Sequence, residues 1–253
     1  ARFIVGSPAK AGNLVISEVH YNPSGPSEEN EFIELMNITD QSIELAGVSF
    51  STGISYAFKD NDRLGPMERL VITPEDYDGQ LDNGGERLTL IDADGSIIES
   101  FKYNDKAPWF EAPDGDGPSL VRIAPQRQLD PELPTSWRPS ADDNGNPGSS
   151  DTASFNGGDL INYALGNNNN VIIVSSGNLI ELKYITKLTA DNAQVTVMLS
   201  DDLMNWQEAN NISTLSQSLS NNSDVESLIR FENQIHKENL DLKFIKLKVE
   251  ASP

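Results

Sequence analysis

Short apolar runs separated by polar turns fill the first half of the chain. Their lengths and their content of β-branched and aromatic residues are typical of strands. The runs cover residues 14–21, 31–37, 43–51, 69–72, 87–92, 97–103 and 119–123. Strands that follow one another without intervening helices predict a β-sandwich rather than an alternating β/α fold.

The residues between these runs are explicit turn formers. The segments 22–26, 64–66 and 82–85 combine Pro, Gly, Asn and Asp, the residues that stabilise tight turns. The strongest hairpin signal is Asp92-Ala93-Asp94-Gly95, which separates LTLI from IIESF. We therefore expect the strands on either side of Asp94-Gly95 to pair directly.

The apolar content falls sharply between residues 126 and 154. This stretch is rich in Pro, Asp, Asn, Ser and Gly, a composition typical of linkers. We predict an extended tail or linker here, between a sandwich of residues 13–125 and a second domain of residues 155–253. Residues 1–12 are interpreted as a linker or as the end of a preceding domain.

The second domain has its own alternation of apolar and polar positions. Gly157 to Gly166 predicts one short helix, and LIELKYI, VTVML and FIKLKV alternate with the period of strands. Ile180, Leu182 and Tyr184 would face inward in the first of these strands. The polar stretch from Asn210 to Asp224 is expected to be a long loop. The whole chain is thus predicted to be all-β, with one short helix in the smaller domain.

The charge and composition of the chain limit the classes of partner that it can bind. The chain has 253 residues, with 18 basic and 39 acidic side chains and a net charge of −21. Such an excess of acidic residues argues against binding to nucleic acid, because proteins bind nucleic acid through clustered Lys and Arg. It also argues against binding to anionic membranes. It suits a protein that must stay soluble in salty water, such as one from a marine bacterium. No apolar run is long enough to span a bilayer.

Cysteine is absent, which excludes disulfides, thiolate zinc sites and cysteine nucleophiles. The two histidines, His20 and His236, lie far apart in sequence, and no nucleophile elbow, zinc-binding helix or phosphate-binding loop is present. Glu18, Glu31 and Glu34 lie in predicted strands, on exposed faces or tied to sheet edges by hydrogen bonds. No catalytic or cofactor-binding residues are assigned, and we predict that the chain is not an enzyme.

The order of motifs in the first domain resembles that of bacterial lamin-tail domains. The resemblance is carried by Ile16-Ser17-Glu18 with Tyr21-Asn22-Pro23, by Glu31 to Leu35, by LDNGGERLTLIDADG and by GPSLVRI. It implies an immunoglobulin-like β-sandwich, in a family whose members are appended to larger extracellular bacterial proteins. We therefore expect a secreted or cell-surface location.

The second domain is similar to a C-terminal module of large secreted proteins of Verrucomicrobia and Planctomycetes. The matching patches are Asn162 to Gly166, the SDDLMNW run, and Phe244 to Val249. This resemblance rests on shorter motifs than the first one. It points to the same extracytoplasmic location.

Acidic loops are the candidate metal sites. Calcium takes six to eight oxygen ligands from carboxylates, amides and carbonyls on a turning backbone. The candidate ligands form three pairs: Asp92 and Asp94, Asp114 and Asp116, and Asp142 and Asp143. The loop APDGDGPS, residues 112–119, is the favoured position for a structural calcium ion. Turn formation explains the same aspartates without a metal.

Tryptophan is the other candidate for recognition, because exposed aromatic rings stack on sugars and fill partner pockets. Trp109 either packs across the end of the sandwich or contacts a ligand. Trp137 is expected to pin the tail back onto the sandwich, and Trp206 to plug the second core.

These observations favour a non-catalytic extracellular module that serves as a spacer, adhesion or docking unit. Its partners would be other domains of the same polypeptide, and a polysaccharide or a surface protein. A carbohydrate-binding accessory module is the first alternative, and an exposed Trp109 would support it. The second is an appendage of a hydrolase or nuclease whose catalytic domain lies outside this chain.

Overall fold

A computed structural model describes residues 6–25, 28–167, 171–176, 179–220, 224–232 and 244–251. Residues 1–5 of the predicted N-terminal linker and His236 lie outside these ranges. The chain forms two compact units, residues 1–151 and residues 152–253. Within the ranges described, no helix is long and apolar enough to cross a membrane.

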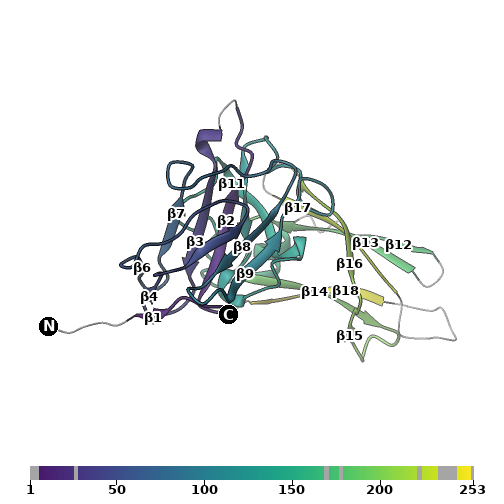
Figure 1. The fold of residues 1–253 in the computed structure, drawn as a ribbon. Helices are drawn as coiled ribbons and strands as arrows, with labels where there is room; N and C mark the ends of the chain where they lie inside the picture. The colour runs from purple at the N-terminus through teal and green to yellow at the C-terminus, as the bar shows by residue number, and fades with distance from the viewer. Residues whose placement is uncertain are drawn as a thin grey trace. The chain divides into compact units, whose positions relative to one another are not determined.

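The first unit consists of three sheets, which are antiparallel apart from the short β1–β4 pair (Figure 1). The largest sheet has the order β11-β10-β2-β3-β7, with bounds β2 Leu14–His20, β3 Phe32–Asn37, β7 Arg69–Ile72, β10 Pro118–Arg122 and β11 Trp137–Asp143. The second sheet has the order β5-β8-β9, with bounds β5 Ser49–Thr52, β8 Arg87–Ile91 and β9 Ile97–Lys102. The third sheet is small, with β1 Ser7–Pro8, β4 Ile43–Glu44 and β6 Arg63–Leu64. Short 3-10 turns are η1 Glu28–Asn30, η2 Pro125–Arg127 and η3 Pro134–Ser136.

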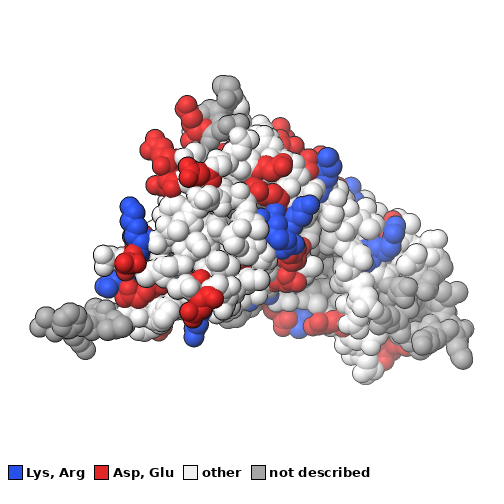
Figure 2. Space-filling model, viewed as in Figure 1, with Lys and Arg blue, Asp and Glu red and all other residues white. Residues whose placement is uncertain are grey.

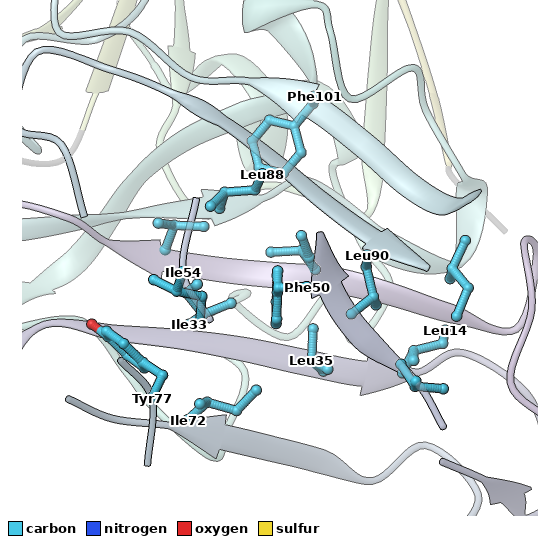
Figure 3. Close-up of a cluster of buried hydrophobic side chains, with 14 of the residues drawn as sticks. Leu14, Ile33, Leu35, Phe50, Ile54, Ile72, Tyr77, Leu88, Leu90 and Phe101 are labelled. Atoms are coloured by element: carbon cyan, nitrogen blue, oxygen red, sulfur yellow. The ribbon is translucent and has the colours of Figure 1, made fainter. Parts of the chain in front are cut away.

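The core lies between the five-stranded sheet and the β5-β8-β9 sheet. Apolar side chains from both sheets meet there in one cluster (Figure 3). Its members include Leu14, Ile33, Leu35 and Ile72 from the larger sheet and Phe50, Leu88, Leu90 and Phe101 from the smaller one. Two sheets joined by such an apolar layer form a β-sandwich, as the strand rhythm predicts.

A β-bulge at Ser17 changes the face that β2 presents to the core. Ile16 pairs with Leu35, but the next pair in register joins Glu18 to Glu34. The extra residue shifts the alternation, because successive side chains of a strand point to opposite faces. Ile16 and Val19 therefore both belong to the core, whereas Glu18 points to the other face of the sheet.

The Asp92–Gly95 hairpin is confirmed. Strands β8 and β9 pair directly, and the amide of Gly95 donates to the carbonyl of Asp92 at 3.0 Å. Gly95 has a φ of 82°, the left-handed conformation that glycine adopts without strain. The run of residues 43–51 is interrupted, since a turn at Leu45–Val48 separates β4 from β5.

The segment from residue 126 to residue 154 differs from the predicted linker. It contains β11, which pairs antiparallel with β10 and forms one edge of the five-stranded sheet. The first half of β11 is fully buried, including Trp137 and Arg138. Trp137 stacks on Phe101 with ring centroids 4.5 Å apart, so the expectation that Trp137 fixes this segment to the sandwich is confirmed.

The described residues of the second unit form two further sheets and one helix. The four-stranded sheet has the order β12-β13-β17-β16, with bounds β12 Ile172–Ser176, β13 Leu179–Lys187, β16 Ser213–Ser220 and β17 Asp224–Glu232. The three-stranded sheet has the order β15-β14-β18, with bounds β14 Ala193–Ser200, β15 Gln207–Glu208 and β18 Phe244–Ala251. The predicted short helix is α1 Leu160–Leu165, and the Asp159 side chain caps it by accepting from two amides of its first turn.

The core of this unit is small and follows the predicted inward positions. Its buried members are Ile180, Leu182, Val197, Leu199, Ile229 and Phe231. Tyr184 is partly buried against them. Trp206 does not join this cluster, contrary to the expectation. It is partly exposed, and the Lys246 ammonium lies 3.9 Å from its ring centroid.

The loop predicted from Asn210 to Asp224 is wrong for most of its length. Ser213–Ser220 forms β16, which pairs antiparallel with β17 through a register that runs from Ser213–Arg230 to Ser220–Asp224. The sequence STLSQSLS contains few apolar side chains. Its strand structure therefore depends on hydrogen bonds to β17 rather than on its own alternation of apolar residues.

Candidate functional site

Four of the predicted acidic metal ligands lie in loops, Asp142 and Asp143 lie at the end of β11, and two of the six accept hydrogen bonds. The Asp92 carboxylate accepts from the amides of Asp94 and Ser96, each at 2.9 Å. The Asp114 carboxylate accepts from the Asn22 side-chain amide at 2.6 Å. Both contacts are typical of aspartate stabilising a turn or joining two loops.

The remaining candidates, Asp116, Asp142 and Asp143, are exposed. Acidic side chains are spread over the face seen in Figure 2. Among the residues that the structure describes, no three His, Asp or Glu side chains converge closely enough to hold a metal ion. The paired aspartates of the sequence are therefore not brought together into one larger acidic cluster there.

Trp109, the candidate ligand contact, packs inside the first unit. It is 7% exposed and belongs to the apolar core. Its amide donates to the carbonyl of Lys106 at 3.0 Å, which closes the turn that carries it. Trp109 was expected either to pack across the end of the sandwich or to contact a ligand, and in the structure it is packed. An aromatic ring buried in this way does not offer a face on which a sugar can stack.

The most unusual feature of the first unit is a set of buried carboxylates on the outer face of the five-stranded sheet. Glu18 and Glu34 are partners in register on neighbouring strands, and they are 2% and 0% exposed. Two like charges at such a position repel each other unless donors surround them. Two of these donors are backbone amides in the segment of residues 144–149, which we call the covering segment; the others are side chains of the sheet.

Glu18 binds the covering segment and the neighbouring strand β10. Its Oε1 atom accepts from the amide of Asn146 at 3.0 Å and from the hydroxyl of Ser119. Gly145 lies directly over this carboxylate. A Cβ atom at that position would lie 2.3 Å from Glu18 Oε1 and 2.8 Å from Phe32 Cζ, so only glycine allows the covering segment to approach so closely.

Glu34 is held by three partners. Its Oε1 atom accepts from the Ser17 hydroxyl at 2.6 Å and from the Arg69 guanidinium, and its Oε2 atom accepts from the Gly148 amide at 2.7 Å. The hydroxyl of Ser17 is available because Ser17 is the extra residue of the bulge in β2. Glu34 thus joins β2, β7 and the covering segment.

The covering segment is anchored at its far end by a second buried ion pair. The Arg138 guanidinium donates to both carboxylate oxygens of Asp151, at 3.1 and 2.5 Å, and the amide of Ala141 donates to the same carboxylate at 2.9 Å. Burial acts to raise the pKa of Asp151, but the hydrogen bonds and the charge of Arg138 hold it below the usual value. This carboxylate is therefore ionised at neutral pH.

Two further buried glutamates make contacts elsewhere in the sandwich, Glu99 with two strands of the larger sheet and Glu31 with a loop. Glu99 accepts from the Ile16 amide at 2.7 Å and pairs with Arg122 at 2.9 Å, and the Arg122 guanidinium lies 5.1 Å from the centroid of the Trp137 ring. Glu31 accepts from the Tyr77 hydroxyl and from the Leu81 amide, each at 3.1 Å. Glu18, Glu31 and Glu34 are therefore buried and hydrogen-bonded rather than on exposed strand faces, but β2 and β3 are inner strands of the sheet, so the bonds do not tie sheet edges.

Burial changes the protonation of two groups in this region. Burial is the main cause that raises the pKa of Glu18 from 4.5 to about 7, and the nearby charges of Glu34 and Asp151 add to it, while the bonds from Ser119 and Asn146 act in the opposite direction. Burial also lowers the pKa of His20 from 6.5 to about 4. His20 packs edge-on against Phe32 at 5.4 Å, as expected for a cross-strand contact.

A carboxyl group that titrates near neutral pH could serve as a general acid or base if it faced a substrate. Glu18 faces the covering segment instead. A surface depression of about 390 Å³ lies nearby, lined by Glu29, Asn30, Glu31, Phe32, Val71, Thr73, Asn144 and Pro147. Glu18 and Glu34 are not among its lining residues, so the perturbed carboxyl and the depression do not form one site.

Residues 7–105 match the family model of the Lamin Tail Domain. This confirms the resemblance for the first unit over that range and identifies its sandwich as immunoglobulin-like. The match ends before β10 and β11, the strands that carry Ser119 and Arg138. No curated protein sequence matches the chain. The similarity of the second unit to secreted bacterial proteins stays a prediction.

Proposed function

We propose that the chain is a non-catalytic spacer or docking module of a larger secreted or cell-surface bacterial protein. The observation that carries this proposal is that the buried carboxylates form hydrogen bonds to residues far away in sequence. Glu18 and Glu34 bind donors at Ser119, Asn146 and Gly148, which lie 101, 128 and 114 residues away in sequence. Such contacts tie early strands of the first unit to its last residues and so oppose local unfolding, which suits a spacer.

The family match agrees with this proposal. Lamin-tail sandwiches are a non-catalytic type of domain, and residues 7–105 have that fold. The extracellular location, the adhesive or docking role, and a partner such as a polysaccharide or a surface protein are inferred from the sequence resemblance. Docking would use loops and sheet edges rather than a deep pocket.

Activity assays on the full chain test the non-catalytic part of the proposal. The chain is incubated with soluble polysaccharides, nucleic acids and chromogenic phosphoesters, and product is measured over time. We expect no turnover above the buffer control. Turnover that disappears in Glu18→Gln, while circular dichroism stays unchanged, would overturn the proposal. Binding of the intact chain to one of the polysaccharides without turnover would select the carbohydrate-binding role.

Localisation is tested in the source bacterium. An antibody against the chain should detect the protein in the culture medium, or on intact cells before permeabilisation. Signal that appears only after lysis would contradict a secreted or surface location, whatever the result of the activity assays.

A structural calcium ion in the loop of residues 112–119 is a separate proposal. It rests on the exposed carboxylates of Asp114 and Asp116 in a glycine-containing turn. A thermal melt of metal-stripped protein with calcium and with chelator tests it. An ion that binds only the folded state raises the midpoint by mass action, and Asp116→Asn should remove that rise. An unchanged midpoint would leave both aspartates as turn formers.

A further inference from the structure

Strand β12 forms an open edge of the four-stranded sheet in the second unit (Figure 1). One side of the strand pairs with β13 without interruption, from Ile172–Lys183 to Ser176–Leu179. Within the ranges that the structure describes, no strand pairs with its other side. An edge of this kind presents a row of backbone N–H and C=O groups to which another strand can bind.

Both faces of β12 are apolar and exposed. Ile172 and Val174 lie on one face and are 53% and 55% exposed. Ile173 lies on the other face, beside the buried Leu182, but it is 48% exposed. The small core of this unit covers β13 and stops before β12. Adjacent exposed aliphatic side chains on one strand are unusual for a surface that stays in water.

Common protections of an edge strand are missing from β12. It contains no charged residue and no proline, and its pairing with β13 has no bulge. Natural proteins use these features to prevent pairing between chains. Their absence here leaves the strand able to accept a partner.

The charges next to this edge are balanced, although the chain carries a net charge of −21. Three acidic side chains of β13 and β17 each pair with a cation: Glu181 with Arg230 at 2.5 Å, Glu226 with Lys183 at 2.7 Å, and Asp224 with Lys187 at 2.6 Å. A second copy of the chain therefore meets no unpaired acidic group of this set here. The same balance gives a basic partner no charge to recognise.

We propose that β12 pairs antiparallel with β12 of a second copy about a two-fold axis. The second copy carries the same uncovered strand, so one contact satisfies both edges at once, as in other isologous interfaces. A centre at Val174, the middle residue, gives full overlap and places Ile172 opposite Ser176 of the second copy. The two four-stranded sheets then form one continuous sheet. This inference does not depend on whether the chain is catalytic.

Sedimentation of the full chain over a roughly hundredfold range of concentration tests the proposal. A single strand edge is small beside stable interfaces, which bury roughly 1,200–2,000 Å², so we expect a dimer that forms reversibly as concentration rises. Ile173→Lys introduces a charge on the edge strand and should weaken dimerisation at least tenfold. Met204→Lys, at a side chain that is 84% exposed in the same unit, should leave it unchanged. Circular dichroism verifies that both variants fold.

A single cysteine locates the contact, because the chain has none of its own. Under mild oxidation we expect Val174→Cys to form a disulfide-linked dimer much faster than Met204→Cys, since only the former lies beside its symmetry mate. Cysteines at residues 172 and 176 give the register if the centre lies elsewhere on β12. The proposal fails if the chain sediments as a monomer throughout, if both lysine variants dimerise equally, or if no cysteine on β12 cross-links faster than Met204→Cys. None of these results would bear on the proposed spacer role.

Discussion

The two units of the chain differ in how many charged side chains they bury and in how their strand edges expose apolar side chains. The first unit buries charged side chains, with Glu34 at 0% and Arg138 at 2% exposure, and pairs them inside the unit: Glu34 accepts from the Gly148 amide, and Arg138 binds Asp151. The second unit leaves aliphatic side chains such as Ile172 and Val174 more than half exposed. The stability of the first unit therefore depends on polar contacts in its interior, and we call this unit closed in that sense. In the part of the second unit that the structure describes, no strand pairs with the outer side of β12.

The largest expected change in the free energy of unfolding comes from removing one member of a buried ion pair. This change tests whether internal polar contacts stabilise the first unit. Arg138→Ala leaves the buried Asp151 carboxylate without its cation, so we expect a loss of roughly 3–5 kcal/mol in the free energy of unfolding. Urea unfolding followed by tryptophan fluorescence measures this loss, because Trp109 and Trp137 both lie in the first unit.

Arg63→Ala is the matched control. Arg63 pairs with Glu44 at 3.1 Å, but its side chain is 56% exposed, and exposed pairs contribute at most about 1 kcal/mol. Equal losses in the two variants would show that the Arg138–Asp151 pair does not anchor the covering segment.

The protonation of Glu18 gives the next largest effect. Its pKa in the folded state, about 7, lies above the ordinary value of 4.5. The folded state therefore binds this proton more tightly, and the stability that results is present below pH 4.5 and is lost as pH rises through about 7. The total change is up to about 3 kcal/mol. Glu18→Gln removes it, so the variant should gain stability relative to the wild type between pH 5 and pH 8.

His20 acts in the opposite direction. Its pKa in the folded state is about 4, below the ordinary value of 6.5, so its contribution is present above pH 6.5 and is lost as pH falls through about 4. Because both proteins contain His20, its effect cancels in the difference between Glu18→Gln and the wild type. A difference that stays constant from pH 5 to pH 8, in urea unfolding at each pH, would refute the raised pKa of Glu18.

Much of the first unit could be predicted from local patterns. The runs that became β2, β3, β7, β8, β9 and β10 were found because their apolar residues face a large core, and the Asp94-Gly95 hairpin because glycine takes the left-handed turn conformation. Strand β11 was missed, since its sequence WRPSADD contains a proline and buries polar groups instead of alternating apolar ones. Strand β16 was missed because pairing with β17, rather than its own composition, holds it.

The buried carboxylates could not be assigned from the sequence alone. The sequences of β2 and β3, LVISEVH and FIELMN, do not show whether their glutamates are buried, and the amides that bind Glu18 and Glu34 lie more than 100 residues later. One signal was available: a stretch rich in Gly, Asn and Ser, ADDNGNPGSS, offers amides with few side chains in the way. Its composition is equally typical of a linker, and only the fold distinguishes the two.

A glycine substitution in the covering segment has a smaller expected effect. In Gly145→Ala the new methyl group would meet Glu18 and Phe32 at less than 3 Å, so we expect a loss of about 1–3 kcal/mol beyond the strain of the backbone. Gly148→Ala is the control. Its φ of 83° resembles the 72° of Gly145, but a Cβ atom there meets nothing within 4 Å. Similar melting temperatures for the two variants would show that the covering segment can move away from the sheet.

The smallest expected effect lies on the open edge of the second unit. Ile173→Thr keeps the β-branched shape that favours strands and removes apolar surface that is already 48% exposed. In dilute, monomeric protein we expect a change in the free energy of unfolding within about 0.5 kcal/mol. Ile180→Thr, at a residue of the same sheet that is 2% exposed, should cost at least about 1 kcal/mol, because it buries a hydroxyl group in the core. Hydrogen exchange of the β13 amides measures both. A large loss in dilute Ile173→Thr would mean that Ile173 supports its own unit, and β12 would then no longer contrast with the closed first unit.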